Sequence, residues 1–451
     1  AQLTATYDGS APTVVIGGAS GSINTPFTAT LTFSESVSGF DVSDVGISNA
    51  LLSDFAGSGA AYTVLVTPNA DGAVTLDVAA SAASDSAGNG NTAAAQLAVT
   101  YDATIPTLTL DGASGDINAP FTANMIFSES VSGFDLSDVQ VTNATLSDFS
   151  GSGASYSVLV TPTADGVVTL DVSADAALDA AGNANSAATQ LLATYDGSAP
   201  TVAISGASGA INTAFTATIA FSESVSGFDV SDLGVSNALL SDFAGSGASY
   251  TVLVTPNADG AVTLDVAAAV AQDVAGNDNS AATQLTATYD ATAPTAVISG
   301  ASGYINAAFT ATITFSESVN DFVVGDIAVS NATLADFSGS GDTYSVLVTP
   351  TTDGAVTLDV AANAAQDAAG NNSAAAAQLA VTYDAIAPTV LLTAPATLVN
   401  AAFTATITFS ENVTDFVVAD ISASNATLSD FSGSGTSYTV LVTPTTDGTV
   451  T

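Results

Sequence analysis

Apolar and hydroxyl-bearing residues alternate along much of this chain of 451 residues. In the segment 27–34, with the sequence FTATLTFS, every second residue is apolar and the residues between are Thr or Ser. Successive side chains of a β-strand point to opposite faces, so this pattern predicts a strand with one buried face. The same alternation recurs at 61–67 and 73–80. We therefore predict an all-β protein.

Turn-forming residues separate these alternating segments. The signals are Gly57-Ser58-Gly59, the segment 68–72 and the segment 85–91. Between them we predict seven strands, at 13–17, 27–34, 42–48, 50–55, 61–67, 73–80 and 94–101. Seven short strands in about 94 residues are typical of an antiparallel β-sandwich of the immunoglobulin type.

The whole pattern repeats along the chain. A Tyr-Asp pair recurs every 94 residues, at Tyr7-Asp8, Tyr101-Asp102, Tyr195-Asp196, Tyr289-Asp290 and Tyr383-Asp384. Solenoid repeats span roughly 20–50 residues, so a period this long indicates a complete small domain. We predict that residues 1–8 are the last strand of a preceding repeat. The repeats that follow, called units 1 to 5 below, are 9–102, 103–196, 197–290, 291–384 and the truncated 385–451.

Several motifs within each unit point to a known family. They are FTATLTFSESVSGF, NALLSDFAGSGAAYTVLVTP, DSAGN and a closing AVTYD, with equivalents throughout the chain. Together they resemble the bacterial Ig-like tandem repeats of giant cell-surface adhesins and biofilm-associated proteins. The resemblance implies seven-stranded sandwiches in a linear rod, an extracellular location at the cell surface or in secreted form, and a stalk or spacer role. It does not indicate what the parent protein binds.

The composition excludes many functions. The chain has 43 Asp and Glu but no Lys, Arg, His or Cys, which gives a formal charge of −43. It therefore lacks the side chains that bind phosphate and nucleic acid, and the His and Cys that ligate metals or act as catalytic nucleophiles and bases. No apolar run reaches the ~18 residues of a membrane-spanning helix. We predict no enzyme activity, no nucleic-acid partner and no membrane insertion.

Strand direction predicts which acids lie together. If the strands alternate in direction, one end of each sandwich collects the linker, the end of the second strand and the last long loop. In unit 1 these segments carry Asp8, Glu35, and Asp85 with Asn89. The equivalent sets are Asp102, Glu129, Asp179 and Asn183; Asp196, Glu223, Asp273 and Asn277; Asp290, Glu317, Asp367 and Asn371; and Asp384 with Glu411.

Three carboxylates in one place, without a basic residue, are unfavourable unless they are protonated or bind a cation. Calcium takes six to eight oxygen ligands in irregular geometry, which suits loop carboxylates and amide oxygens. We therefore predict calcium as the cofactor of these sets. The alternative is that they are solvated loop acids and turn residues. Asp71, which precedes Gly72, is interpreted as a turn residue between the fifth and sixth strands.

The sequence favours a structural function. We predict an extracellular stalk or spacer whose partners are the neighbouring repeats, with calcium rigidifying each junction and Pro106 restricting the linker. One alternative is the subunit of a self-assembling filament, formed by strand exchange or lateral contacts. A second is a glycan- or ice-binding module, suggested by the outward row Thr28, Thr30 and Thr32. Phe27, Phe33, Phe40 and Tyr62 are interpreted as core residues rather than as a sugar-binding platform.

Overall fold

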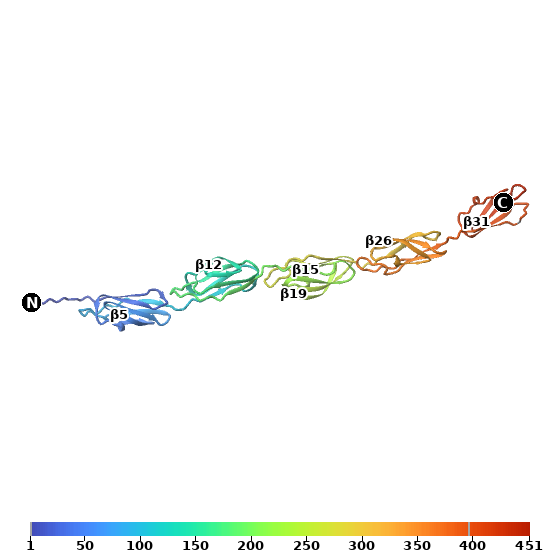
Figure 1. Cartoon of the computed structure of the whole chain (residues 1–451). Coiled ribbons are helices and arrows are strands. Elements are labelled where there is room, and N and C mark those ends of the chain that lie inside the picture. The colour runs from blue at the N-terminus through green and yellow to red at the C-terminus, as the bar shows by residue number, and fades with distance from the viewer. Residues whose placement is uncertain (1, 396) are drawn as a thin grey trace.

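The computed structural model describes residues 2–395 and 397–451 and shows separate β-sandwiches joined end to end (Figure 1). Each of the five units has its own hydrophobic core cluster. The described residues form strands and short 3-10 turns but no α-helix. Accordingly, no helix in this part of the chain is long and apolar enough to cross a membrane. The predicted fold class, all-β with tandem Ig-like sandwiches, is confirmed.

Unit 1 shows the plan that the next three units repeat. Its strands are β1 (Val14–Gly17), β2 (Ser22–Ile23), β3 (Phe27–Val37), β4 (Val45–Ser48), β5 (Ala50–Pro68), β6 (Gly72–Val78) and β7 (Leu97–Tyr101). One sheet has the strand order β1-β3-β5 and the other β2-β7-β6-β4. All pairs are antiparallel except β2 with β7, which run parallel.

The corresponding strands of the later units have nearly the same lengths. Unit 2 contains β8 (Leu108–Asp111), β9 (Gly115–Ile117), β10 (Phe121–Val131), β11 (Val139–Thr142), β12 (Ala144–Pro162), β13 (Gly166–Val172) and β14 (Leu191–Tyr195). Unit 3 contains β15 (Val202–Ser205), β16 (Gly209–Ile211), β17 (Phe215–Val225), β18 (Leu233–Ser236), β19 (Ala238–Pro256), β20 (Gly260–Val266) and β21 (Leu285–Tyr289). Unit 4 contains β22 (Ala296–Ser299), β23 (Tyr304–Ile305), β24 (Phe309–Val319), β25 (Ile327–Ser330), β26 (Ala332–Pro350), β27 (Gly354–Val360) and β28 (Leu379–Tyr383). Unit 5 contains β29 (Val390–Thr393), β30 (Phe403–Val413) and β31 (Ala426–Pro444).

The strands differ in several places from those that the sequence predicts. Residues 2–8, predicted as the last strand of a preceding repeat, form no strand. The short strand β2 was not predicted. The predicted strand 42–48 starts as a 3-10 turn, Val42–Asp44, and only 45–48 is a strand. The predicted strands 50–55 and 61–67 form one continuous strand, β5, which bends back on itself so that the N–H of Asn69 donates to the carbonyl of Asn49 at 3.0 Å. Finally, β3 runs to Val37, so Glu35 lies within the strand rather than just after it.

The core forms where the alternation predicts it. Along β3, Ala29 and Leu31 are fully buried and Phe33 is nearly so, whereas the Thr residues between them face solvent. Leu76 of β6 faces them from the other sheet and is also fully buried. Because each strand exposes one face to water, burial of the apolar face drives the two sheets together.

Aromatic rings close one end of this core. The Phe33 and Phe40 rings meet edge to face with centroids 5.0 Å apart, and the Phe55 and Tyr62 rings stack at 5.6 Å. Phe33, Phe40 and Tyr62 are buried, as the sequence predicts, and the same ring cluster recurs in units 2 to 5. Phe27 packs against the core but is only partly buried.

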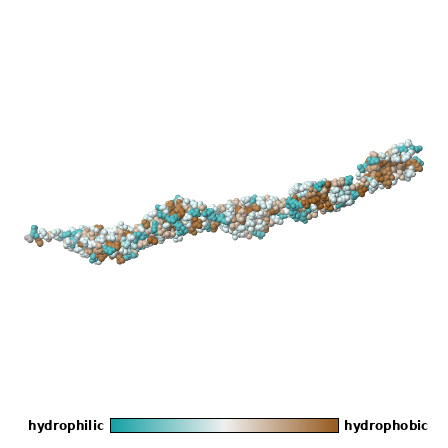
Figure 2. Space-filling view, in the orientation of Figure 1, coloured by the Kyte–Doolittle hydropathy of each residue, from teal (hydrophilic) through white to brown (hydrophobic). Residues whose placement is uncertain are grey.

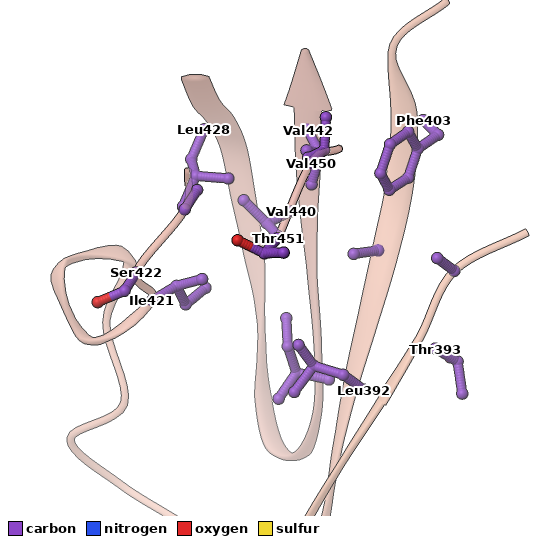
Figure 3. A pocket seen from close by; sticks show the side chains of 14 residues that line it. Leu392, Thr393, Phe403, Ile421, Ser422, Leu428, Val440, Val442, Val450 and Thr451 are labelled. Carbon is purple, nitrogen blue, oxygen red and sulfur yellow. The ribbon is translucent and has the colours of Figure 1, made fainter. Parts of the chain in front are cut away.

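Unit 5 has a more open core than the others. After Pro444 the described residues form no strand, and β29, β30 and β31 make a single sheet. A cavity of about 230 Å³ lies against this sheet, lined by residues such as Leu392, Ile407 and Val440 (Figure 3). Figure 2 shows apolar residues on the visible surface of this unit, and Leu391 and Leu392 are each 62% exposed.

Candidate metal centre

Three acids from separate parts of the chain meet where one unit joins the next. In unit 2 they are Asp102 in the linker, Glu129 in β10 and Asp179 in the loop after β13. One carboxylate oxygen of each residue lies within 4.8 Å of those of the other two. The expectation that these acids lie together is therefore confirmed, and their role as metal ligands stays a prediction.

The same group of acids, called the acid triad below, recurs with the period of the chain. The structure brings together Asp8, Glu35 and Asp85; Asp102, Glu129 and Asp179; Asp196, Glu223 and Asp273; and Asp290, Glu317 and Asp367. In unit 5, Asp384 and Glu411 line the same hollow beside the linker. Figure 2 shows hydrophilic residues gathered where units 2 and 3, and units 3 and 4, meet.

The loop aspartate of each triad is held in place by its own loop. Asp179 is only 5% exposed, and its carboxylate accepts hydrogen bonds from the N–H groups of Ala181 and Asn183, both at 2.8 Å. Gly182 permits this tight bend through a φ of +93°, a backbone conformation that suits glycine. Burial raises the pKa of Asp179, but these hydrogen bonds outweigh burial and the pKa lies below its usual value. Asp179 is therefore ionised and fixed before any cation arrives.

The linker aspartate belongs to two units at once. The N–H of Asp102 donates to the carbonyl of Ile23 in unit 1 at 2.9 Å. Its carbonyl accepts a hydrogen bond from the Asn183 side chain of unit 2 at 2.8 Å. Its carboxylate accepts the N–H of Thr104 at 3.0 Å, and a carboxylate oxygen also reaches the triad. Any ligand of this carboxylate therefore acts on the connection between the units.

The glutamate experiences the negative charge of the whole group. Burial raises the pKa of the Glu129 carboxyl, and nearby negative charges raise it further. These charges belong to Asp102, Asp179 and Asp71. The pKa values of Glu223 and Glu317 are raised in the same way. Every glutamate of the chain occupies this one position, whereas the remaining acids are aspartates, and the extra methylene lengthens its reach from the strand toward the aspartates.

One atom at the last junction has no partner. Among the described residues, Glu411 Oε1 is the buried side-chain polar atom for which no hydrogen bond is formed. A buried acceptor without a donor is unfavourable, because the oxygen has given up water and received nothing in exchange.

These groups fit a hard divalent cation. The triad offers only oxygen atoms, and the chain has no Lys, Arg or His to neutralise them. Calcium prefers carboxylate and carbonyl oxygens and tolerates the irregular geometry of loops, whereas zinc and copper are usually held by Cys or His. The raised pKa of Glu129 and the orphan oxygen of Glu411 are both consistent with a site in which a positive charge is missing.

The repeating units match a known family along nearly the entire chain. The profile described as bacterial Ig-like domain matches residues 8–101, 102–195, 196–289, 290–383 and 384–451. The chain belongs to the bacterial Ig-like domain family. No curated protein matches it.

Several solved structures are similar to this bacterial Ig-like array. The bacterial integrin-binding protein invasin is 14% identical, with a TM-score of 0.33, and the match covers 86% of this chain and 82% of invasin. The Escherichia coli adhesin FdeC is 15% identical, with a TM-score of 0.32, over 63% of this chain and 98% of FdeC.

Sequence reasoning missed the residue that anchors the triad loop in units 1 to 4. Asn185 is 2% exposed; its side-chain oxygen accepts the N–H of Ala177 at 2.7 Å, and its amide donates to the carbonyls of Ser173 and Ser186. Asn91 and Asn279 do the same in units 1 and 3, and Ser373 replaces them in unit 4. An Asn at a fixed register inside a predicted loop was the only signal.

The amides predicted as further ligands have defined contacts in the structure. The Asn183 amide nitrogen donates to Asp179 at 2.7 Å as well as to the linker carbonyl of Asp102. Its oxygen accepts the amide of Asn24 from unit 1 at 3.2 Å. Asn371 and Asn212 make the equivalent contact between units 4 and 3. The Asn side chains thus fasten the junction, and the ligand role of Asn89, Asn183, Asn277 and Asn371 stays a prediction.

Proposed function

We propose that this bacterial Ig-like array is an extracellular stalk or spacer whose junctions are rigidified by calcium. The observation that carries the proposal is the acid triad, which recurs four times along the described residues and at three junctions includes a residue shared by two units. The elongated arrangement of the units in Figure 1 suits a protein that holds something at a distance. No reaction is part of this proposal.

The proposed mechanism is electrostatic. Without a cation, repulsion among Asp102, Glu129 and Asp179 favours linker positions that separate the carboxylates. A bound calcium ion supplies the missing positive charge and attracts all three. Because Asp102 is also hydrogen bonded to unit 1, the ion then limits how unit 2 turns against unit 1. The amide of Asn183 holds the linker carbonyl beside the loop, so fewer degrees of freedom remain to be ordered on binding.

Small-angle scattering of the full chain tests this proposal. Addition of calcium to metal-free protein should increase the maximum dimension and narrow the range of shapes. The triple variant Glu129→Gln, Glu223→Gln and Glu317→Gln should not respond, because each triad loses a charge. The matched control Asp77→Asn, Asp171→Asn and Asp265→Asn removes three charges from β6, β13 and β20, where each pairs with a Gln and none belongs to a triad. An unchanged wild-type dimension would refute calcium rigidification.

A further inference from the structure

A second connection between units lies outside the acid triad. The turn between β5 and β6 carries Asp71, which the sequence predicts only as a turn residue. In the structure its carboxylate accepts the N–H of Ala103 at 2.8 Å and the hydroxyl of Thr104 at 2.6 Å. Both donors belong to the linker that leads into unit 2. Asp71 of unit 1 therefore constrains the linker that follows this unit.

This pair of hydrogen bonds recurs at the next two junctions. Asp165 accepts the N–H of Gly197 at 2.7 Å and the hydroxyl of Ser198 at 2.6 Å. Asp259 accepts the N–H of Ala291 at 2.7 Å and the hydroxyl of Thr292 at 2.6 Å. The hydroxyl position varies between Thr and Ser, which share the donor group and differ by one methyl group. What recurs is one carboxylate that accepts two donors from the linker.

The fourth junction lacks half of this connection. Ile386 stands where the other linkers carry Thr104, Ser198 and Thr292. An isoleucine side chain cannot donate a hydrogen bond, so Asp353 retains only the N–H of Ala385 at 2.9 Å. The Ile386 side chain is 68% exposed and gains no burial that would replace the lost contact.

Two hydrogen bonds to one planar carboxylate constrain direction as well as distance. Each bond requires its donor to approach along a lone-pair direction, so the pair fixes the orientation of the linker against the turn. A single hydrogen bond still lets the linker rotate about the line between donor and acceptor. These hydrogen bonds are exposed, and each contributes little free energy. A small free-energy difference is nevertheless enough to shift the populations of the orientations that a linker allows.

We propose that Asp71, Asp165 and Asp259 are positioning residues that set the direction of the following unit without any metal, and that the linker 384–388 is the most flexible junction of the chain. The inference rests on the proposed stalk function for its biological meaning. It does not depend on calcium, because both hydrogen bonds are made within the polypeptide.

Distances between units measured in metal-free protein test the proposal. The chain contains no Cys, so two introduced cysteines can carry spin labels without other changes. The pairs Ser241→Cys with Ala335→Cys, and Ala335→Cys with Ser429→Cys, place exposed labels at equivalent positions on units 3, 4 and 5. Pulsed electron paramagnetic resonance should give a broader distance distribution between the labels on units 4 and 5 than between those on units 3 and 4.

The decisive experiment exchanges the side chains at positions 292 and 386 between the two junctions. Thr292→Ile should broaden the distribution between units 3 and 4, and Ile386→Thr should narrow the one between units 4 and 5. Neither change alters the net charge. Thr292→Ser keeps the hydroxyl and should leave the distribution unchanged. If the distance distributions keep their widths in both exchanged proteins, the proposal is wrong.

Two further measurements separate this proposal from calcium binding. Asp259→Ala should broaden the distribution between units 3 and 4 in metal-free protein. The control Asp265→Ala removes a partly buried charge that pairs within unit 3, with Gln284, and should not. Repeating all measurements in calcium tests the stalk function separately. If calcium has no effect but the exchanges do, calcium rigidification fails and the positioning role stands.

Discussion

Asn183 of unit 2 donates a hydrogen bond of 2.8 Å to the backbone carbonyl of Asp102, the residue with which unit 1 ends. The same amide nitrogen contacts the carboxylate of Asp179, so one side chain joins the linker to the loop of the acid triad. Asx contacts of this kind are common within turns, but here the contact crosses between two repeats. The geometry of the triad and the geometry of the junction are therefore coupled through Asn183.

The first expectation concerns the number of cations bound. The full chain should bind about four calcium ions, one at each described triad. Glu223→Gln should remove one of these, because the triad of unit 3 then has two charges. Glu223→Asp should weaken the same site without abolishing it, because the shorter side chain keeps its charge but loses reach. Isothermal titration calorimetry gives the stoichiometry, and a number unaffected by Glu223→Gln would contradict the assignment.

The second expectation is a pH dependence of stability in metal-free protein. In the folded chain the pKa values of Glu129, Glu223 and Glu317 lie above about 4.5, their usual value. The folded chain thus retains protons that the unfolded chain has already lost. Raising the pH from about 4.5 through the raised pKa values should therefore lower the free energy of unfolding. Below about pH 3.8 the opposite applies, because the lowered pKa of Asp179 makes protonation destabilising.

Thermal unfolding between pH 3 and 7, with and without calcium, measures both effects. Calcium should abolish the loss of stability at the higher pH, because it neutralises the triad. The triple variant with Glu129→Gln, Glu223→Gln and Glu317→Gln serves as the control and should lose this part of the pH dependence. Metal-free stability that rises steadily from pH 4.5 to 7 would speak against the raised glutamate pKa values.

The third expectation concerns Asn185, which anchors the loop that carries Asp179. Asn185→Ala should lower the free energy of unfolding of unit 2 by about 2 kcal/mol, because the buried N–H of Ala177 and the partly buried carbonyls of Ser173 and Ser186 lose their partner. Asn185→Ser, which imitates Ser373 of unit 4, should cost less. The exposed Gln190→Ala is the control and should change stability by about 0.5 kcal/mol or less. Chemical denaturation of the full chain would reveal the difference.

The fourth expectation is that the units unfold separately. Ile219→Ala removes a fully buried side chain from the core of unit 3 and should cost about 3–4 kcal/mol. Ile126→Ala, in unit 2, removes a side chain that is 48% exposed and should cost much less. Because the five cores are separate clusters, calorimetry should show one component moving to lower temperature in the Ile219→Ala protein. A shift of the entire transition would mean that the units unfold as one body.

Much of the fold follows from local pattern. The alternation in 27–34 identifies the buried face of β3, because a strand exposes every second side chain to the same side. It does not reveal β2, which has two residues and is defined by pairing with β7. It also divides β5 into two strands, since Gly57 and Gly59 look like a break and are instead the bend of one continuous strand.

The same division applies to the site. Asp102, Glu129 and Asp179 were predicted together because strand direction determines at which end of a sandwich each segment lies. Whether side chains touch is decided by their directions in three dimensions. For this reason the sequence indicates Asp71 only as a turn residue, although its carboxylate reaches across to the next linker.

Residue order and the two-residue period of a strand are sufficient to predict the all-β class, the 94-residue repeat and the grouping of acids. The support that Asn185 gives to the triad loop, and the contacts by which Asp71 and Asn183 join neighbouring units, are visible only in the folded chain. These contacts link residues far apart in the chain, and their hydrogen bonds form only where folded backbones bring donor and acceptor within about 3 Å.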